Sequence, residues 1–272
     1  MSGLDRERIE GLKSPLATEV ELHEELGSTQ ERARELAREG APHGTLVVSK
    51  VQTGGRGRLG RRWGSPAGGL WMSLVLRPDV PAQVAARITQ AAAVGVAKAL
   101  RELGVEARIK WPNDLLVSGR KICGILAESS VGNVPVAAKK VGTQEGRRVD
   151  FVVLGVGLNA NLDSQDLGVP DRAATTLRSE LGRDVDMLEL LRSLLAHLGS
   201  ELGRIGDFGA ILDDWRALDC TLGERVRVQR FGEILEGVAR DLGPEGELLL
   251  ETNDGVIELF EGEVEQLRRE RT

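Results

Sequence analysis

Periodic apolar positions divide the first two thirds of the chain into alternating helices and strands. Ala33, Leu36 and Ala37 share one helical face after Gly27-Ser28-Thr29, which predicts a helix over about 30–39 that ends near Gly40. A second helix is expected at 81–104, where the sequence is rich in alanine, and a third, amphipathic helix at 185–205. Short runs rich in apolar and β-branched residues predict strands at 45–52, 69–77, 105–111, 121–129 and 151–159.

The pattern changes near Leu218, after which the chain contains only short strand-like runs. Four strands are expected at 224–231, 233–242, 246–254 and 255–264, a spacing typical of a small antiparallel barrel or sandwich. We therefore predict two domains, 1–217 and 218–272. Between Ser129 and Arg148 the sequence becomes polar and basic, which indicates an exposed hairpin turn.

Composition narrows the class of protein. Of the 272 residues, 41% are hydrophobic and 29% charged, as in ordinary globular proteins. The longest apolar stretches, 91–97 and 151–157, are too short to cross a bilayer, and the charged N-terminal segment lacks an export signal, so we expect no membrane association and a cytoplasmic location. The net charge of −6 and the absence of tyrosine argue against nucleic acid as a partner. Cys123 and Cys220 stand alone and are predicted to be reduced, structural thiols.

The loop at 52–69, QTGGRGRLGRRWGSPAGG, carries the first chemical signal. Arg56, Arg58, Arg61 and Arg62 are interleaved with Gly54, Gly55, Gly57 and Gly60, and this combination lets backbone and guanidinium groups approach an anion closely. Gly55, Gly57 and Gly60 formally satisfy the dinucleotide pattern GxGxxG, but no helix can begin at the third glycine, and the P-loop pattern is absent. The alternative is a solvated basic loop without function.

The second signal is KWPNDLLVSGRKICGIL at 110–126. A carboxylate at a turn, here Asp114, can hold Mg²⁺ or orient a ribose or an attacking amine, and Lys121 on the adjoining strand can neutralise a phosphate and a carboxylate that must meet. Read alone, Asp114 is more readily explained as a turn-capping residue, and Lys110 and Lys121 as surface lysines.

Taken together and in order, GRGRLGR with its following tryptophan, KWPNDL, KICGIL and GVGLN resemble the successive motifs of the biotin–protein ligase family, from about Val20 to the C-terminus. The resemblance implies an α+β fold: a mixed-sheet catalytic domain of the biotin/lipoate ligase type and a small SH3-like β-barrel. It implies ATP-dependent formation of biotinyl-5'-AMP, with Mg²⁺, and transfer of biotin to a lysine of a biotin carboxyl carrier protein. A homodimer is an open alternative, since relatives include dimers.

Site residues follow from the same resemblance. Asp114 matches an aspartate that activates or orients the acceptor lysine, and Asn159 matches an asparagine near the nucleotide and metal, so either is a candidate Mg²⁺ ligand. The candidate catalytic residues are Lys121, Asp114 and Arg58. The candidates for biotin are Ser28, Thr29, Gln52, Gly55, Arg56, Gly57, Arg58, Lys121 and Gly124. The candidates for the nucleotide are Arg56, Arg58, Trp63, Lys110, Asn113, Lys121 and Asn159.

The sequence departs from the family's usual motifs at two positions, and two alternative functions stay open. Lys50 replaces a more usual acidic residue, and Gly54 replaces the commoner alanine. About 19 residues precede the catalytic segment, too few for a winged helix, so a DNA-binding repressor form is not expected. The alternatives are a lipoate or octanoate ligase of the same architecture and a non-catalytic regulator that binds the adenylate.

Overall fold

A seven-stranded mixed sheet forms the body of the protein. The computed structural model describes residues 4–267 except 6, 7, 10, 13, 132–147 and 169–172. The strands lie in the order β1-β2-β3-β7-β6-β5-β4, in which β1 and β2 are parallel and all other neighbours antiparallel. Their bounds are β1 Glu19–Leu26, β2 Thr45–Gln52, β3 Leu70–Leu76, β4 Arg108–Lys110, β5 Asp114–Val117, β6 Arg120–Val131 and β7 Val149–Leu158.

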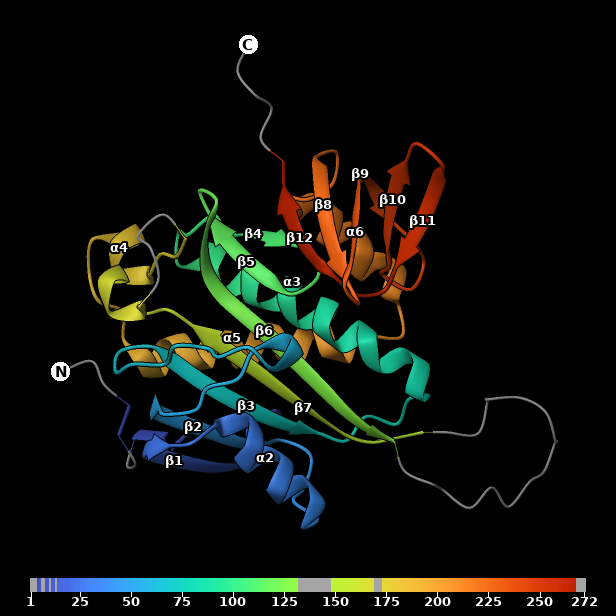
Figure 1. The fold of residues 1–272 in the computed structure, drawn as a ribbon. Coiled ribbons are helices and arrows are strands. Elements are labelled where there is room, and N and C mark those ends of the chain that lie inside the picture. The colour runs from blue at the N-terminus through green and yellow to red at the C-terminus, as the bar shows by residue number, and fades with distance from the viewer. Residues whose placement is uncertain are drawn as a thin grey trace, which may run out of the picture.

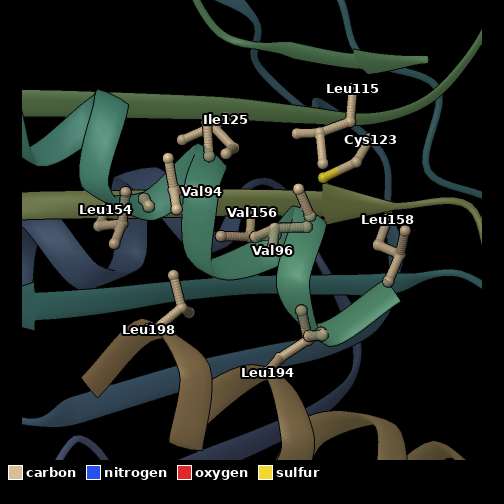
Figure 2. Close-up of a cluster of buried hydrophobic side chains, with 14 of the residues drawn as sticks. Val94, Val96, Leu115, Cys123, Ile125, Leu154, Val156, Leu158, Leu194 and Leu198 are labelled. Atoms are coloured by element: carbon tan, nitrogen blue, oxygen red, sulfur yellow. The ribbon is translucent and has the colours of Figure 1, made fainter. Parts of the chain in front are cut away.

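One face of this sheet is covered by helices α3 (Arg87–Glu102) and α5 (Met187–Gly203), and α6 (Phe208–Leu218) packs against α3 (Figure 1). The main core lies between these layers, where Val94 and Val96 of α3 meet Leu154 and Val156 of β7 (Figure 2). Alternate residues of a strand point to opposite faces, so Val153, Gly155 and Gly157 face away from this core.

The opposite face is only partly covered. Helix α2 (Thr29–Arg38) buries Ala33 and Ala37 against Val47, Val75 and Val153. Beyond the N-terminus of α2 the same face meets the glycine- and arginine-rich loop, which includes the short 3₁₀ helix η1 (Arg58–Gly60). The short helices η2 (Ala82–Ala86), η4 (Ser164–Leu167) and α4 (Leu177–Leu181) lie in connections.

After α6 the chain forms a separate five-stranded antiparallel sheet in the order β11-β10-β9-β8-β12. Its strands are β8 Arg225–Arg230, β9 Glu233–Leu242, β10 Leu248–Thr252, β11 Gly255–Leu259 and β12 Glu263–Gln266. The α+β class and the small antiparallel C-terminal unit agree with the sequence-based prediction. Among the described residues, no helix has the length and apolarity that crossing a membrane requires.

Several elements differ from the sequence-based prediction in their bounds or were not predicted. The long helix predicted at 81–104 is η2 followed by α3, and the last predicted strand, 255–264, is two strands separated at 260–262. Strands β1 and β5 and helices α4 and α6 were not predicted. Asp114 is the first residue of β5 and not part of the turn, which Trp111–Asn113 form. The predicted hairpin between Ser129 and Arg148 falls mostly on 132–147, outside the described residues, although the flanking β6 and β7 pair as a hairpin requires.

Candidate functional site

A cavity of about 530 Å³ lies on the sheet face that α2 leaves open. The arginine-rich loop lines one side of it, and residues of β8 and β12 in the C-terminal sheet line its mouth. Thirteen of the fourteen predicted site residues line it: Ser28, Thr29, Gln52, Arg56, Gly57, Arg58, Trp63, Lys110, Asn113, Asp114, Lys121, Gly124 and Asn159. Segments far apart in sequence therefore converge on one cavity.

The floor of the cavity is neutral and rich in hydrogen-bonding groups. At the start of α2, the backbone N–H and the hydroxyl of Thr29 both donate to Gln52 Oε1, at 2.8 and 3.0 Å. Gln52 Nε2 in turn donates to Ser65 Oγ at 2.7 Å, which fixes the orientation of the amide. The buried hydroxyl of Ser28 has no hydrogen-bond partner among the residues that the structure describes, so it is available to a ligand.

Glycines shape the middle of the cavity around Trp63. A methyl group at Gly157 would lie 2.6 Å from Trp63 Nε1, and one at Gly124 would lie 3.1 Å from the same ring, so side chains at either position would displace the indole. The Lys121 ammonium lies 4.8 Å from the centroid of the Trp63 ring. Trp63 Nε1 is buried, and no described residue accepts a hydrogen bond from it. The indole thus separates the neutral floor from the basic mouth.

Gly55 is the one predicted ligand residue that does not line the cavity. Its carbonyl accepts from Trp63 N at 2.9 Å, and a Cβ on Gly55 would overlap the Trp63 carbonyl and Ser65 Oγ. The backbone crosses itself closely here, so Gly55 allows the loop to fold. Next along the chain, Gly57 N donates to Arg61 O at 2.8 Å and closes the turn that presents Arg58.

The loop arginines reach other parts of the protein. Arg58 Nη1 donates to Asn113 Oδ1 at 3.2 Å and to the carbonyl of Gly262 at 3.3 Å, which connects the loop to both sheets. Burial lowers the pKa of the Arg58 guanidinium, while the nearby Asp114 carboxylate opposes that shift. Arg61 forms an ion pair with Glu263, and Arg56 Nη1 lies 2.6 Å from Glu31 Oε1.

Lys121 and Asp114 form an ion pair in the cavity wall, with Lys121 Nζ 2.7 Å from Asp114 Oδ1. Both belong to the β5–β6 hairpin, in which Asp114 lies opposite Gly124. The side chain of Asn113 donates to Ile125 O at 2.7 Å and holds the preceding turn against β6. The hairpin therefore presents a cation and a carboxylate side by side, both partly exposed to the cavity.

Asn159 lies just after β7 and is buried. Its Nδ2 donates to Thr175 O at 3.0 Å and to Lys121 O at 3.4 Å, which turns Oδ1 away from these carbonyls. In the described part of the chain Oδ1 has no hydrogen-bond partner, so it can accept from a ligand or bind a cation. No cluster of three or more His, Cys, Asp or Glu side chains suited to a metal ion occurs in the part of the chain that the structure describes.

Sequence patterns missed some lining residues. Gln30 and Ser73 border the floor, and Arg227, Gly262 and Glu263 of the C-terminal sheet border the mouth. Gln30 follows Ser28-Thr29 directly and could have been found from that position, whereas nothing local marks the C-terminal residues. Cys123 and Cys220 are both free, in agreement with the prediction of reduced thiols. Burial raises the pKa of Cys123 above its ordinary range and that of Cys220 to about 11, which disfavours the reactive thiolate at either position.

The arrangement suits two ligands that react with each other. The neutral floor can bind a polar head group, and the cations at the mouth can bind phosphates and a carboxylate. Both meet beside Lys121 and Trp63. The fold and the cavity together are those of an α+β protein suited to bind an acid next to a phosphorylated compound.

Comparison with known proteins assigns this class. The model of the biotin/lipoate A/B protein ligase family matches residues 24–143, and that of the biotin protein ligase C-terminal domain matches residues 221–265. The bifunctional ligase/repressor BirA of Bacillus subtilis is 36% identical over 263 residues, covering 94% of this chain and 76% of that protein. A biotin–[acetyl-CoA-carboxylase] ligase of Paracoccus denitrificans is 34% identical, covering 82% of this chain and 90% of that protein.

Solved structures give the same result. Biotin protein ligase from Aquifex aeolicus in complex with biotin and ATP superposes with a TM-score of 0.73 at 28% identity, covering 93% of this chain and 100% of that one. The chain therefore belongs to the biotin protein ligase family.

Proposed function

We propose that this protein activates biotin with ATP to give biotinyl-5'-AMP and transfers the biotinyl group to a lysine of a biotin carboxyl carrier protein. The observation that carries the proposal is the single cavity in which a neutral floor of Ser28, Thr29 and Gln52 leads directly to the cations Arg56, Arg58 and Lys121. The names of the Paracoccus denitrificans and Aquifex aeolicus proteins support biotin, and not lipoate, as the acid.

In the first half-reaction a carboxylate oxygen of biotin bonds to the α-phosphorus as the bond to the pyrophosphate oxygen breaks. Both reactants are anionic, so their approach requires cations that are already in place. Lys121 provides one at the junction of floor and mouth, and Arg58 provides another from the loop. When the two anions bind, the Lys121 ammonium breaks its ion pair with Asp114 and pairs with the anions instead.

That exchange prepares the second half-reaction. Released from Lys121, the Asp114 carboxylate can orient the acceptor lysine and receive its proton. The lysine nitrogen bonds to the acyl carbon of the adenylate, the bond from that carbon to the phosphate oxygen breaks, and AMP leaves. The ion pair at 2.7 Å thus supports separate roles for two neighbouring residues, Lys121 in adenylation and Asp114 in transfer.

The cavity also fits a magnesium ion bound to the nucleotide. Mg²⁺ in nucleotide sites takes one or two protein oxygens together with phosphate oxygens and water. Of the two candidate ligands, the unpartnered Oδ1 of Asn159 is the oxygen donor that we assign to it, which leaves the Asp114 carboxylate for the acceptor lysine. The ion would reduce the charge of the triphosphate.

The remaining assignments follow the same proposal. The matched C-terminal domain model at 221–265 and the end of α6 at Leu218 support a division into 1–217 and 218–272. The carrier protein is the proposed partner. A cytoplasmic location, a homodimer and the lack of nucleic-acid binding stay predictions from the sequence.

The choice of acid can be tested by incubating the protein with ATP, Mg²⁺ and either biotin or lipoate. With biotin we expect stoichiometric bound adenylate by mass spectrometry, together with release of pyrophosphate; with lipoate we expect neither. Omission of ATP is the control for simple binding. Equal adenylate formation with the two acids would contradict the assignment to biotin.

A second prediction concerns retention of the adenylate. Arg58→Gly removes both hydrogen bonds from the loop to Asn113 and Gly262, each made by a charged donor, so the loop should open more readily. We expect the adenylate to escape about 10- to 100-fold faster and to label exposed lysines of a bystander protein.

The rate of escape can be followed by transferring preloaded enzyme into excess unlabelled biotin. Arg183→Gly, at an exposed loop outside the cavity, is a matched control that should retain the adenylate. Retention by Arg58→Gly equal to that of the unaltered protein would show that Arg58 does not hold the loop closed.

A further inference from the structure

The turn between β8 and β9 carries a large apolar residue where a small polar residue or glycine is usual. Arg230 pairs with Glu233, so the turn consists of Phe231 and Gly232, whose φ angles are 48° and 84°. Positive φ at both positions is typical of a type I′ turn, which favours asparagine, aspartate or glycine at the first of them. A bulky side chain in this left-handed conformation destabilises the turn.

The tip of the arginine-rich loop repeats this arrangement. Leu59 and Gly60 have φ angles of 55° and 75°, and Arg61 N donates to Arg58 O at 3.2 Å across them. Among the residues that the structure describes, the only other non-glycine residue with positive φ is Ser118. Residues held in such sparsely populated conformations cluster at functional sites.

The two apolar side chains are also the most exposed of their kind. Phe231 is 78% exposed and Leu59 is 67% exposed, the highest values among the large apolar residues of the described chain. Neither side chain gains stability from burial in the free protein. An unfavourable backbone conformation combined with an exposed apolar side chain indicates that both residues are buried against a partner.

Both turns lie at the mouth of the cavity; we call Leu59-Gly60 the loop tip and Phe231-Gly232 the hairpin tip. Arg58 and Arg61 border the loop tip, line the cavity and contact Gly262 and Glu263 respectively. Glu263 lies opposite Gln229 in the pairing of β12 with β8, and Gln229 lines the cavity two residues before Phe231. The contacts between the loop and β12 therefore connect the two tips around one opening.

The charged side chains beside the tips pair within the protein. Arg61 pairs with Glu263, and Arg227 Nη2 lies 2.8 Å from Glu236 Oε1. Ile234, which lines the cavity three residues after Phe231, is 63% exposed and adds to the apolar surface. A partner that covers this rim would therefore be recognised mainly through apolar contacts, as at the centre of a typical interface.

We propose that Leu59 and Phe231 form a docking surface for the biotin carboxyl carrier protein, which places apolar residues beside its acceptor lysine against the two tips. The inference rests on the proposed function, in which that lysine reaches Asp114 and the adenylate inside the cavity. The lysine enters through the mouth, so the protein that carries it must cover the rim on which both tips lie.

The test replaces each residue by asparagine, which removes the apolar side chain and suits the type I′ turn. We expect Phe231→Asn to raise the KM for the carrier about tenfold, and the double variant with Leu59→Asn about 100-fold. The kcat at saturating carrier should stay within about twofold. The melting temperature should stay equal or rise, whereas residues that only stabilise the fold would lower it when replaced.

Hydroxylamine separates docking from chemistry, because this small nucleophile attacks the acyl carbon of the bound adenylate and releases AMP without covering the rim. Phe231→Asn should leave the rates of adenylate synthesis and of cleavage by hydroxylamine unchanged. Val256→Thr is the matched control, since Val256 is 60% exposed but lies on β11, at the opposite edge of the sheet from β12. It should leave the KM for the carrier unchanged.

A KM for the carrier that is the same in the double variant and the unaltered protein would overturn the inference. Equal slowing of the reactions with carrier and with hydroxylamine would do the same, since the residues would then act on the site itself. If Phe231→Asn lowered the molecular mass in ultracentrifugation without changing the KM, the surface would belong to a second copy of this chain. These results would leave the proposed function intact, whereas failure of the unaltered protein to biotinylate the carrier would contradict both.

Discussion

Lys121→Ala is expected to slow synthesis of the biotinyl adenylate by about 10²–10³-fold, the usual cost of losing one preorganised charge at a reacting centre. The Lys121 ammonium lies where the floor meets the mouth, 2.7 Å from Asp114 and 4.8 Å from the Trp63 ring centroid. Transfer from adenylate supplied ready-made should be slowed less, because the carboxylate and the phosphate are then already joined.

Single-turnover assays separate the two steps: pyrophosphate release reports synthesis, and biotin incorporation from synthetic adenylate reports transfer. Lys50→Ala is the matched control, since Lys50 pairs with Glu24 on β1 and does not line the cavity. It should affect neither step. Equal slowing of both steps by Lys121→Ala would mean that Lys121 does not act mainly in adenylation.

Asp114→Asn should slow transfer of biotin more than synthesis of the adenylate. An amide keeps the size of the side chain and its place in β5, but it cannot receive a proton or stabilise an ammonium group. A free lysine has a pKa of about 10.4 and is mostly protonated at neutral pH, so loss of its partner should slow transfer by about 10²-fold, within the range usual for general-base catalysis. Synthesis of the adenylate should change by less than about tenfold.

The pH dependence of transfer gives an independent measure of the same role. If Asp114 assists deprotonation, the deficit of Asp114→Asn should shrink at high pH, where more of the acceptor lysine is already neutral. Asp150→Asn, which alters a carboxylate paired with Arg77 at the far end of β7, is the control. A transfer rate for Asp114→Asn equal to that of the unaltered protein at every pH would remove Asp114 from the reaction.

Thirteen of the fourteen candidate residues line the cavity, and they were assigned through the resemblance of the ordered motifs to a known family. Local patterns alone were not sufficient, because Asp114, Lys110 and Lys121 read singly have ordinary structural explanations. Gly55 is the exception, because its role is to let the loop cross itself near Trp63 and Ser65, which depends on contacts that no motif states.

Some missed elements did have local signals. Ser118 and Gly119 both have positive φ in the β5–β6 turn, and a Ser-Gly pair between apolar runs is a recognised hairpin pattern. Helix α6 follows an Asp207 cap and places Phe208, Ile211 and Trp215 on one buried face, which is the ordinary helical period. Strand β1 is different: its charged residues suit an edge strand and obscure the alternation.

Other features depend on long-range packing. The C-terminal sheet contributes Gly262 and Glu263 to the mouth of the cavity through bonds to Arg58 and Arg61, more than 200 residues away in sequence. Hydrogen bonds that run from Thr29 through Ser73 and Gln30 to Glu128 likewise join α2, β3 and β6. Such contacts arise only when the sheet order brings separate strands together, so residue patterns along one segment cannot predict them.

The proposed function requires one cavity to perform both activation and transfer with biotin. The most direct test is intact-mass measurement of a purified biotin carboxyl carrier domain after incubation with this protein, ATP, Mg²⁺ and biotin. We expect a gain of one biotinyl group, lost when the acceptor lysine of the carrier is replaced by arginine or when ATP is omitted. An unmodified carrier in the presence of enzyme-bound adenylate, or equal modification by lipoate, would contradict it.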